Sequence, residues 1–148
     1  MDNSLNLKYI GFIQEYNNIP EALPYVDVFD NNHNKISNTI TKIVNYLDKG
    51  YLACSCPGVI MDLNNENLLY PDAYFTDGVY IWPSYFLYYL VHYPNFKIDK
   101  EFIDYLLKKE FKYTTIGFFK KRKLRKMENY LEDKLIGSTR STDYMSTE

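Results

Sequence analysis

Residues 73–83 constrain the fold more than any other stretch of the chain. Asp77 and Gly78 lie between two β-favouring runs, and Asp-Gly is a preferred pair for a tight two-residue turn, because both positions need positive φ. A hairpin with this turn pairs Thr76 with Val79, Phe75 with Tyr80, Tyr74 with Ile81, and Ala73 with Trp82. Pro83 lacks a backbone N–H and presets φ, which suits the start of a helix. We therefore expect the hairpin to pass directly into a helix at Pro83.

The helix expected after Pro83 has no polar face. Residues 85–91 are aromatic or aliphatic on every side of the axis, which is typical of a helix buried on more than one side. The run is too short to span a bilayer, for which about 20 apolar residues are needed. It predicts the central helix of a soluble core.

The first half of the chain predicts one more helix and several strands. Apolar residues recur at helical spacing from Ser37, which can cap the first amides, and Gly50 lies where such a helix ends. Tyr51–Ser55 and Val59–Leu63 are expected to be strands joined by a turn at residues 56–58, and residues 7–14 are expected to form a further strand.

The second half predicts two amphipathic helices. Asp99 can cap the first, and its apolar stripe consists of Phe102, Ile103, Leu106 and Leu107. The second runs from about Thr115 to Leu135, with Leu124, Met127, Leu131 and Leu135 aligned. Residues 137–148 are rich in Ser and Thr and are expected to be disordered.

These elements predict an α+β fold. A small antiparallel sheet, made of hairpins at 51–63 and 73–82, packs against about four helices in a single domain of residues 1–136. A chain of 148 residues is long enough to bury one cooperative core.

Charge is divided unevenly along the chain. Residues 1–96 carry four lysines and ten acidic side chains, whereas residues 97–136 carry twelve basic and seven acidic side chains. Opposed charge of this kind steers charged partners. The polar N-terminus has no cleavable leader, so we expect the protein to be cytoplasmic.

The inventory of catalytic side chains is small. His92 could act as a general base with Asp62, Asp72 or Asp77 as the orienting carboxylate, which would make a small hydrolase, but a partly buried structural histidine is the more common outcome. Cys54 and Cys56 have no neighbouring base or cation in sequence that would activate a thiol. We expect no enzyme activity, no metal and no cofactor.

The sharpest charge feature is the basic run at residues 120–126. In a helix within residues 118–135, it spreads positive charge next to two phenylalanines, a pattern found in nucleic-acid-binding proteins. The residues expected to contact phosphates are Lys120, Lys121, Arg122 and Arg125. A solvated helix face is the alternative.

Spaced motifs in the chain resemble a known family. These are Tyr46-Leu47-x-x-Gly50, the segment 76–83, Tyr88-Tyr89 and Glu101-Phe102. Together they are similar to a skeleton shared by small, mostly uncharacterised bacterial proteins of the immunity type, and the similarity covers about residues 43–107. Such proteins belong to polymorphic toxin and contact-dependent growth inhibition systems, in which each neutralises one cognate toxin.

The resemblance implies a binding protein that blocks a toxin's active site or substrate path. Many toxic nucleases are basic because they grip phosphates, so an acidic surface would speed the encounter. We expect the toxin to meet carboxylates and aromatic anchors around the hairpin, namely Asp62, Glu66, Asp72, Tyr74, Asp77 and Tyr80.

Overall fold

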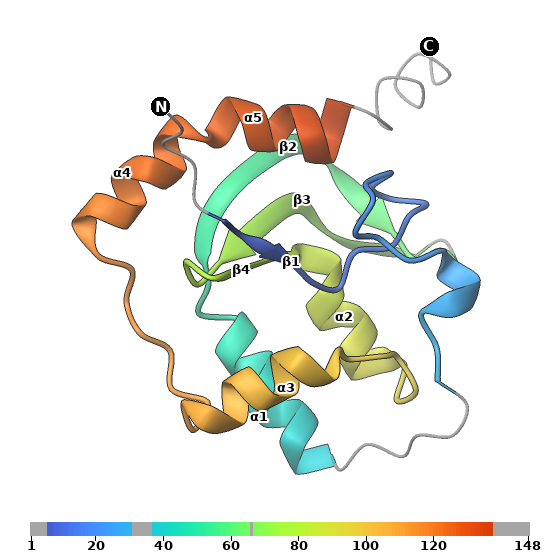
Figure 1. The fold of residues 1–148 in the computed structure, drawn as a ribbon. Helices are drawn as coiled ribbons and strands as arrows, with labels where there is room; N and C mark the ends of the chain where they lie inside the picture. The colour runs from blue at the N-terminus through green and yellow to red at the C-terminus, as the bar shows by residue number, and fades with distance from the viewer. Residues whose placement is uncertain (1–5, 31–36, 66, 138–148) are drawn as a thin grey trace.

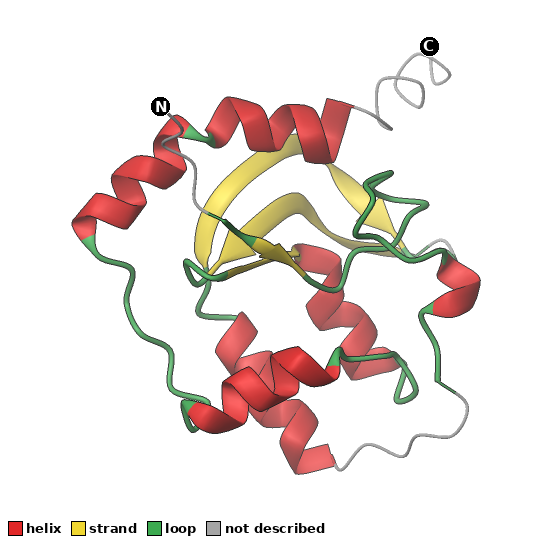
Figure 2. Cartoon of the chain, viewed as in Figure 1, coloured by secondary structure: helices red, strands yellow, loops and turns green. Residues whose placement is uncertain are grey.

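A computed structural model describes residues 6–30, 37–65 and 67–137, and in it the chain forms an α+β fold (Figures 1 and 2). Four strands form one mixed sheet in the order β1-β4-β3-β2. The strands are β1 (Lys8–Tyr9), β2 (Tyr51–Met61), β3 (Leu68–Thr76) and β4 (Tyr80–Pro83). β1 runs parallel to β4, and the other two pairings are antiparallel.

Helices cover both faces of the sheet, as Figure 1 shows. One face carries α1 (Ser37–Leu47), α2 (Ser84–His92) and α3 (Lys100–Lys108), and the other is crossed by α5 (Glu128–Glu132), which follows α4 (Phe118–Lys126). A 3₁₀ turn, η1, spans Tyr25–Asp27, and a π-helical turn, η2, spans Asp133–Gly137. No helix in the described ranges has the length and apolar character needed to cross a membrane.

The two faces of the hairpin lie in two separate cores, because side chains alternate along a strand. Tyr80 and Trp82 pack with residues of α1, α2 and α3 in the larger core. Tyr74 and Ile81 pack in the smaller core with Leu131 and Leu135. The sheet is therefore buried on both sides, as its apolar faces require.

Several predictions are confirmed. The α+β class is present, the hairpin passes into α2 directly after Pro83, and the carboxylate of Asp99 accepts a hydrogen bond from the Glu101 N–H at 3.0 Å to cap α3. The predicted C-terminal stripe is buried at Leu124, Met127, Leu131 and Leu135. Apolar spacing and capping chemistry were sufficient to locate these elements.

The predicted two-residue turn is wrong. Thr76 pairs with Ile81 and Phe75 with Trp82, so the register shifts by two residues, and residues 77–79 form the loop between β3 and β4. Side chains take over the hydrogen bonds of the loop: the Asp77 carboxylate accepts from the N–H groups of Val79 and Tyr80, and Thr76 Oγ1 accepts from the Gly78 N–H. A two-residue shift keeps each side chain on its expected face.

The predicted hairpin at 51–63 is also wrong. Residues 51–61 form the single strand β2, which pairs with β3, and the Pro57-Gly58 dipeptide lies in an irregular part of that strand instead of a turn. β2 is at the edge of the sheet, where a proline without an N–H and a bulge are both tolerated. β3 accordingly begins at Leu68, five residues before the predicted start of the second hairpin at Ala73.

Two further boundaries differ from prediction. The strand expected over residues 7–14 is only two residues long and parallel to its neighbour. The last helix begins at Phe118, not Thr115, and is interrupted at Met127. The Ser37 cap and residues 138–148 of the predicted tail lie outside what the structure describes.

Candidate functional site

The carboxylates predicted to meet a partner lie in the interior. Asp62 and Asp72 are each 1% exposed, and Asp77 is 8% exposed. Their expected exposure is therefore wrong, because Asp62 and Asp77 each accept from two tyrosine hydroxyls and Asp72 accepts from one, and buried hydroxyls need such acceptors. Glu66 lies outside the described residues.

Asp77 is the centre of the first buried cluster. Its Oδ2 atom accepts hydrogen bonds from the hydroxyls of Tyr46 at 2.5 Å and Tyr105 at 2.7 Å, which join α1 and α3 to the hairpin. Lys109 Nζ donates to the Tyr46 hydroxyl at 2.9 Å and lies 5.1 Å from the centre of each of the two rings. Burial, followed by the bond to Asp77, raises the pKa of both tyrosines well above the ordinary value. The hydroxyls of Tyr46 and Tyr105 therefore stay protonated, and the cluster connects α1 and α3 to the hairpin.

Asp62 is the centre of a second cluster. Its Oδ2 atom accepts from the hydroxyls of Tyr88 at 2.6 Å and Tyr93 at 2.8 Å, and Oδ1 accepts from the Asn64 N–H at 2.6 Å. Burial alone would raise the pKa of Asp62, but the bonds from Tyr88, Asn64 and Tyr93 together lower it. The bond to Asp62 is also the main reason that the pKa of Tyr88 rises to about 12.

The two aromatic anchors predicted for the partner are buried as well. The Tyr74 hydroxyl donates to Asp72 at 2.7 Å and accepts from Asn17 at 2.8 Å. Tyr80 packs edge-on against Phe102, with ring centres 4.8 Å apart. Neither side chain is positioned to reach a partner directly.

Residues that carry the family resemblance come together in space. A Cβ at Gly50 would lie 2.6 Å from the Trp82 ring, so only glycine fits there, and Tyr46 bonds to Asp77. Phe102 completes the group through its contact with Tyr80. The shared pattern therefore describes one packed unit of the fold.

The candidate catalytic groups are not assembled into a site. His92 is exposed, stacks on Tyr88 and has its Nδ1 atom 3.0 Å from the Tyr88 carbonyl oxygen, whereas the described bonds of Asp62, Asp72 and Asp77 go to tyrosines and backbone. Burial raises the pKa of Cys54 to about 12, which disfavours a thiolate. Within the described ranges, no three His, Cys, Asp or Glu side chains are grouped as metal ligands would be.

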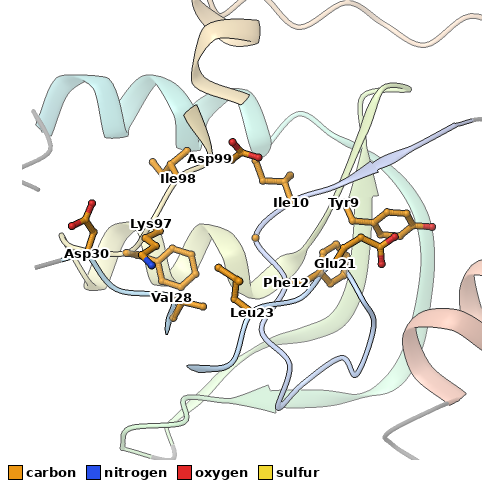
Figure 3. A pocket seen from close by; sticks show the side chains of 12 residues that line it. Tyr9, Ile10, Phe12, Glu21, Leu23, Val28, Asp30, Lys97, Ile98 and Asp99 are labelled. Carbon is orange, nitrogen blue, oxygen red and sulfur yellow. The ribbon is translucent and has the colours of Figure 1, made fainter. Parts of the chain in front are cut away.

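A groove of about 430 Å³ opens beside β1, and we call it the acidic groove (Figure 3). Its walls come from residues 9–12, 21–30 and 96–99, and the last two stretches are joined by backbone bonds from Lys97 to Val28 and from Asp30 to Asn95. Three carboxylates and one ammonium group line it, belonging to Glu21, Asp30, Asp99 and Lys97. Sequence analysis missed these acids, although residues 19–30 combine two prolines with acidic and apolar residues, as exposed recognition segments often do.

The free edge of β1 faces away from β4 at this groove. The N–H groups of Lys8 and Ile10 bond to the carbonyl oxygens of Val79 and Ile81 in the neighbouring strand and loop, so the N–H and C=O of Tyr9 point outward. Leu23, one of the lining residues, is 44% exposed, and Val26, three residues further along the chain, is 80% exposed. A strand edge with which no other described strand pairs, beside an apolar side chain and carboxylates, can receive an extended segment of another chain.

The opposite end of the molecule carries the predicted basic helix, α4 (Figure 1). Of the four cations expected to contact phosphates, Arg122 and Arg125 are exposed, and so is Lys120, which lies near Gly78. Lys121 is half-buried over the Tyr51 ring at 5.3 Å. Phe118 and Phe119 are 65% and 77% exposed, with ring centres 5.6 Å apart.

Comparison of this chain with family models, with curated proteins and with solved structures gives no match.

Proposed function

We propose that this protein is a cytoplasmic, non-enzymatic immunity protein that binds a toxin domain and blocks its active site or substrate path. The resemblance of residues 43–107 gives the class. The observation that carries the proposal is the acidic groove at the edge of β1, with exposed Leu23 in its lining.

The groove supports a particular form of docking. Main-chain groups at the edge of β1 can pair with an extended segment, while Asp30 and Asp99 favour lysine or arginine side chains in that segment. Glu21 is already paired with Lys134 at 2.9 Å, so most of the attraction comes from the other two carboxylates and from exposed Asp27.

An interface with a basic partner also explains why apolar side chains lie beside acidic ones in this region. Interfaces combine an apolar centre with a charged rim, and Val26 lies next to Asp27 in η1. The carboxylates would speed association with a basic nuclease domain, and the apolar contacts would slow dissociation. The mechanism inferred from the sequence, attraction between an acidic surface and a basic toxin, is retained. The acidic residues are now Asp27, Asp30 and Asp99.

The test is binding and rescue with the toxin encoded by the neighbouring reading frame. The protein is expected to form a complex with this toxin at micromolar concentration or below and to suppress its toxicity on co-expression. Absence of a complex, or undiminished toxicity, contradicts the function.

A charge-reversed variant tests the surface separately. Leu23→Lys with Asp30→Lys, at two residues that line the groove, is expected to raise the Kd of the complex at least about tenfold, a cost of about 1.4 kcal/mol. The matched control is Leu107→Lys with Asp48→Lys, which changes the same residue types at exposed positions on α3 and just after α1. If both double variants bind equally well, the groove is the wrong surface even though the function holds.

A further inference from the structure

The outward side of α4 has an ordered pattern. At helical spacing, Phe118, Arg122 and Arg125 form one row, and Phe119, Lys123 and Lys126 form a second row beside it. Each row begins with a phenylalanine and continues with two cations. Both rows lie away from Leu124, the one buried residue of α4. We call these six residues the basic stripe.

The charges of the basic stripe have no internal counterpart among the described residues. The four ion pairs there involve Lys8, Lys100, Lys112 and Lys134, all outside α4. Lys120 and Lys121 lie toward the body of the protein, near Gly78 and over Tyr51, and are not part of the stripe. Four cations and two aromatic rings therefore face solvent together.

Folding does not explain this composition. The first turn of α4 contains no acidic residue, and Gly117 at its N-cap provides no side-chain hydrogen bond. Repulsion among neighbouring cations opposes helix formation, although the helix dipole favours Lys123, Arg125 and Lys126, which lie in the last turn. Exposed phenylalanines add no burial to offset this cost. The stripe is thus better explained by a ligand than by stability.

We propose that the basic stripe binds single-stranded nucleic acid. The cations would follow the phosphates along a helix about 13 Å long, and the Phe118 and Phe119 rings would stack with unpaired bases at one end. Two adjacent exposed rings, set edge to face, give stacking surfaces that a duplex cannot use because its bases are already stacked. An acidic protein surface would satisfy the cations but would not require the aromatic pair. This binding is independent of the toxin-binding groove, which lies on a different part of the molecule.

The first experiment measures binding of the full chain to a fluorescent single-stranded oligonucleotide of mixed sequence, about 12 nucleotides long, by anisotropy. The same strand in a duplex, and polyglutamate, are the competitors. The single strand is expected to bind more tightly than either. The logarithm of the association constant is expected to fall with the logarithm of salt concentration with a slope of about −3, as four phosphate contacts predict.

Two sets of variants separate charge from stacking. Replacement of Arg122, Lys123, Arg125 and Lys126 by Gln is expected to abolish most of the salt dependence of the association constant for the single strand. Its control is the replacement by Gln of four exposed lysines elsewhere, Lys49, Lys100, Lys108 and Lys112, which changes net charge equally. Phe118→Ala with Phe119→Ala is expected to weaken single-strand binding about tenfold, unlike its control, Val91→Ala with Leu107→Ala.

Three outcomes overturn the proposal. One is the absence of binding to the single strand at about 50 mM salt. Another is equal competition by polyglutamate, which reduces the stripe to a general polyanion surface or assigns it to an acidic protein. The third is equal loss in the stripe variants and their matched controls. The stripe variants leave the groove unchanged, so their toxin binding tests the groove alone. Either proposal can therefore fail without the other.

Discussion

The hairpin region and α4 use charge in opposite ways. Around the hairpin, Asp62, Asp72 and Asp77 are buried and receive hydrogen bonds from tyrosines. In α4, the four cations of the basic stripe face solvent with no ion pair among the described residues. The charge counted along a stretch of sequence therefore differs from the charge that the stretch presents at the surface.

Side-chain chemistry explains the difference. A carboxylate is compact and can accept several hydrogen bonds, so a group of tyrosine hydroxyls can stabilise it in the interior. Lysine and arginine have long stems and bring their charged ends back to water. With 16 tyrosines in the chain, many hydroxyls need acceptors, and short acidic side chains near the hairpin supply them.

The largest expected effect tests the structural use of buried charge. Asp77→Ala removes the acceptor of two tyrosine hydroxyls and two backbone N–H groups, and is expected to lower the free energy of unfolding by about 3–5 kcal/mol. Chemical denaturation measures this loss. Asp48→Ala, at an exposed site, is the control and is expected to change stability by less than about 0.5 kcal/mol. Equal effects in the two variants would remove the contrast between buried and exposed acids.

A pH series sharpens the same contrast at Asp62. Because the pKa of Asp62 in the folded chain is below the ordinary aspartate value of 3.8, the ionised form stabilises the fold above pH 3.8, and this contribution is lost as pH falls through the folded pKa. The difference in free energy of unfolding between the wild type and Asp62→Asn is therefore expected to shrink at acidic pH. Denaturant titrations from pH 7 downward measure it. A difference that does not change with pH contradicts the inferred role of the tyrosine bonds.

The smallest expected effect concerns the stability contribution of α4. Replacement of Arg122, Lys123, Arg125 and Lys126 by Gln is expected to change the free energy of unfolding by less than about 1 kcal/mol, since these side chains are exposed and unpaired among the described residues. Denaturant titration at low and moderate salt measures it. A loss above about 2 kcal/mol would mean that the cations support the fold and would weaken the contrast with the hairpin.

Local chemistry was enough to predict many of the elements. The Asp99 cap, the proline before α2 and the spacing of Leu124, Met127, Leu131 and Leu135 each act within one or two turns of helix. The two faces of the hairpin were also predictable, because alternation along a strand survives a register shift of two residues.

Tertiary context decided the features that prediction missed. Pro57 and Gly58 usually mark a turn. Because β2 is at the edge of the sheet, the missing N–H of Pro57 and the nearby bulge do not disturb the pairing of a further strand. The burial of Asp62 depends on the hydroxyls of Tyr88 and Tyr93, which lie 26 and 31 residues further along the chain. The acidic groove likewise joins segments 9–12, 21–30 and 96–99, and its carboxylates are recognisable only once these meet.

Trp82 gives the molecule a built-in optical reporter. It is the single tryptophan, is fully buried behind Gly50, and its indole N–H has no hydrogen-bond partner among the described residues. In such dry surroundings its fluorescence emission lies at short wavelength and shifts to longer wavelength when water reaches the ring. Trp82 belongs to neither the groove nor the basic stripe, so its spectrum follows unfolding while labels on a ligand follow binding.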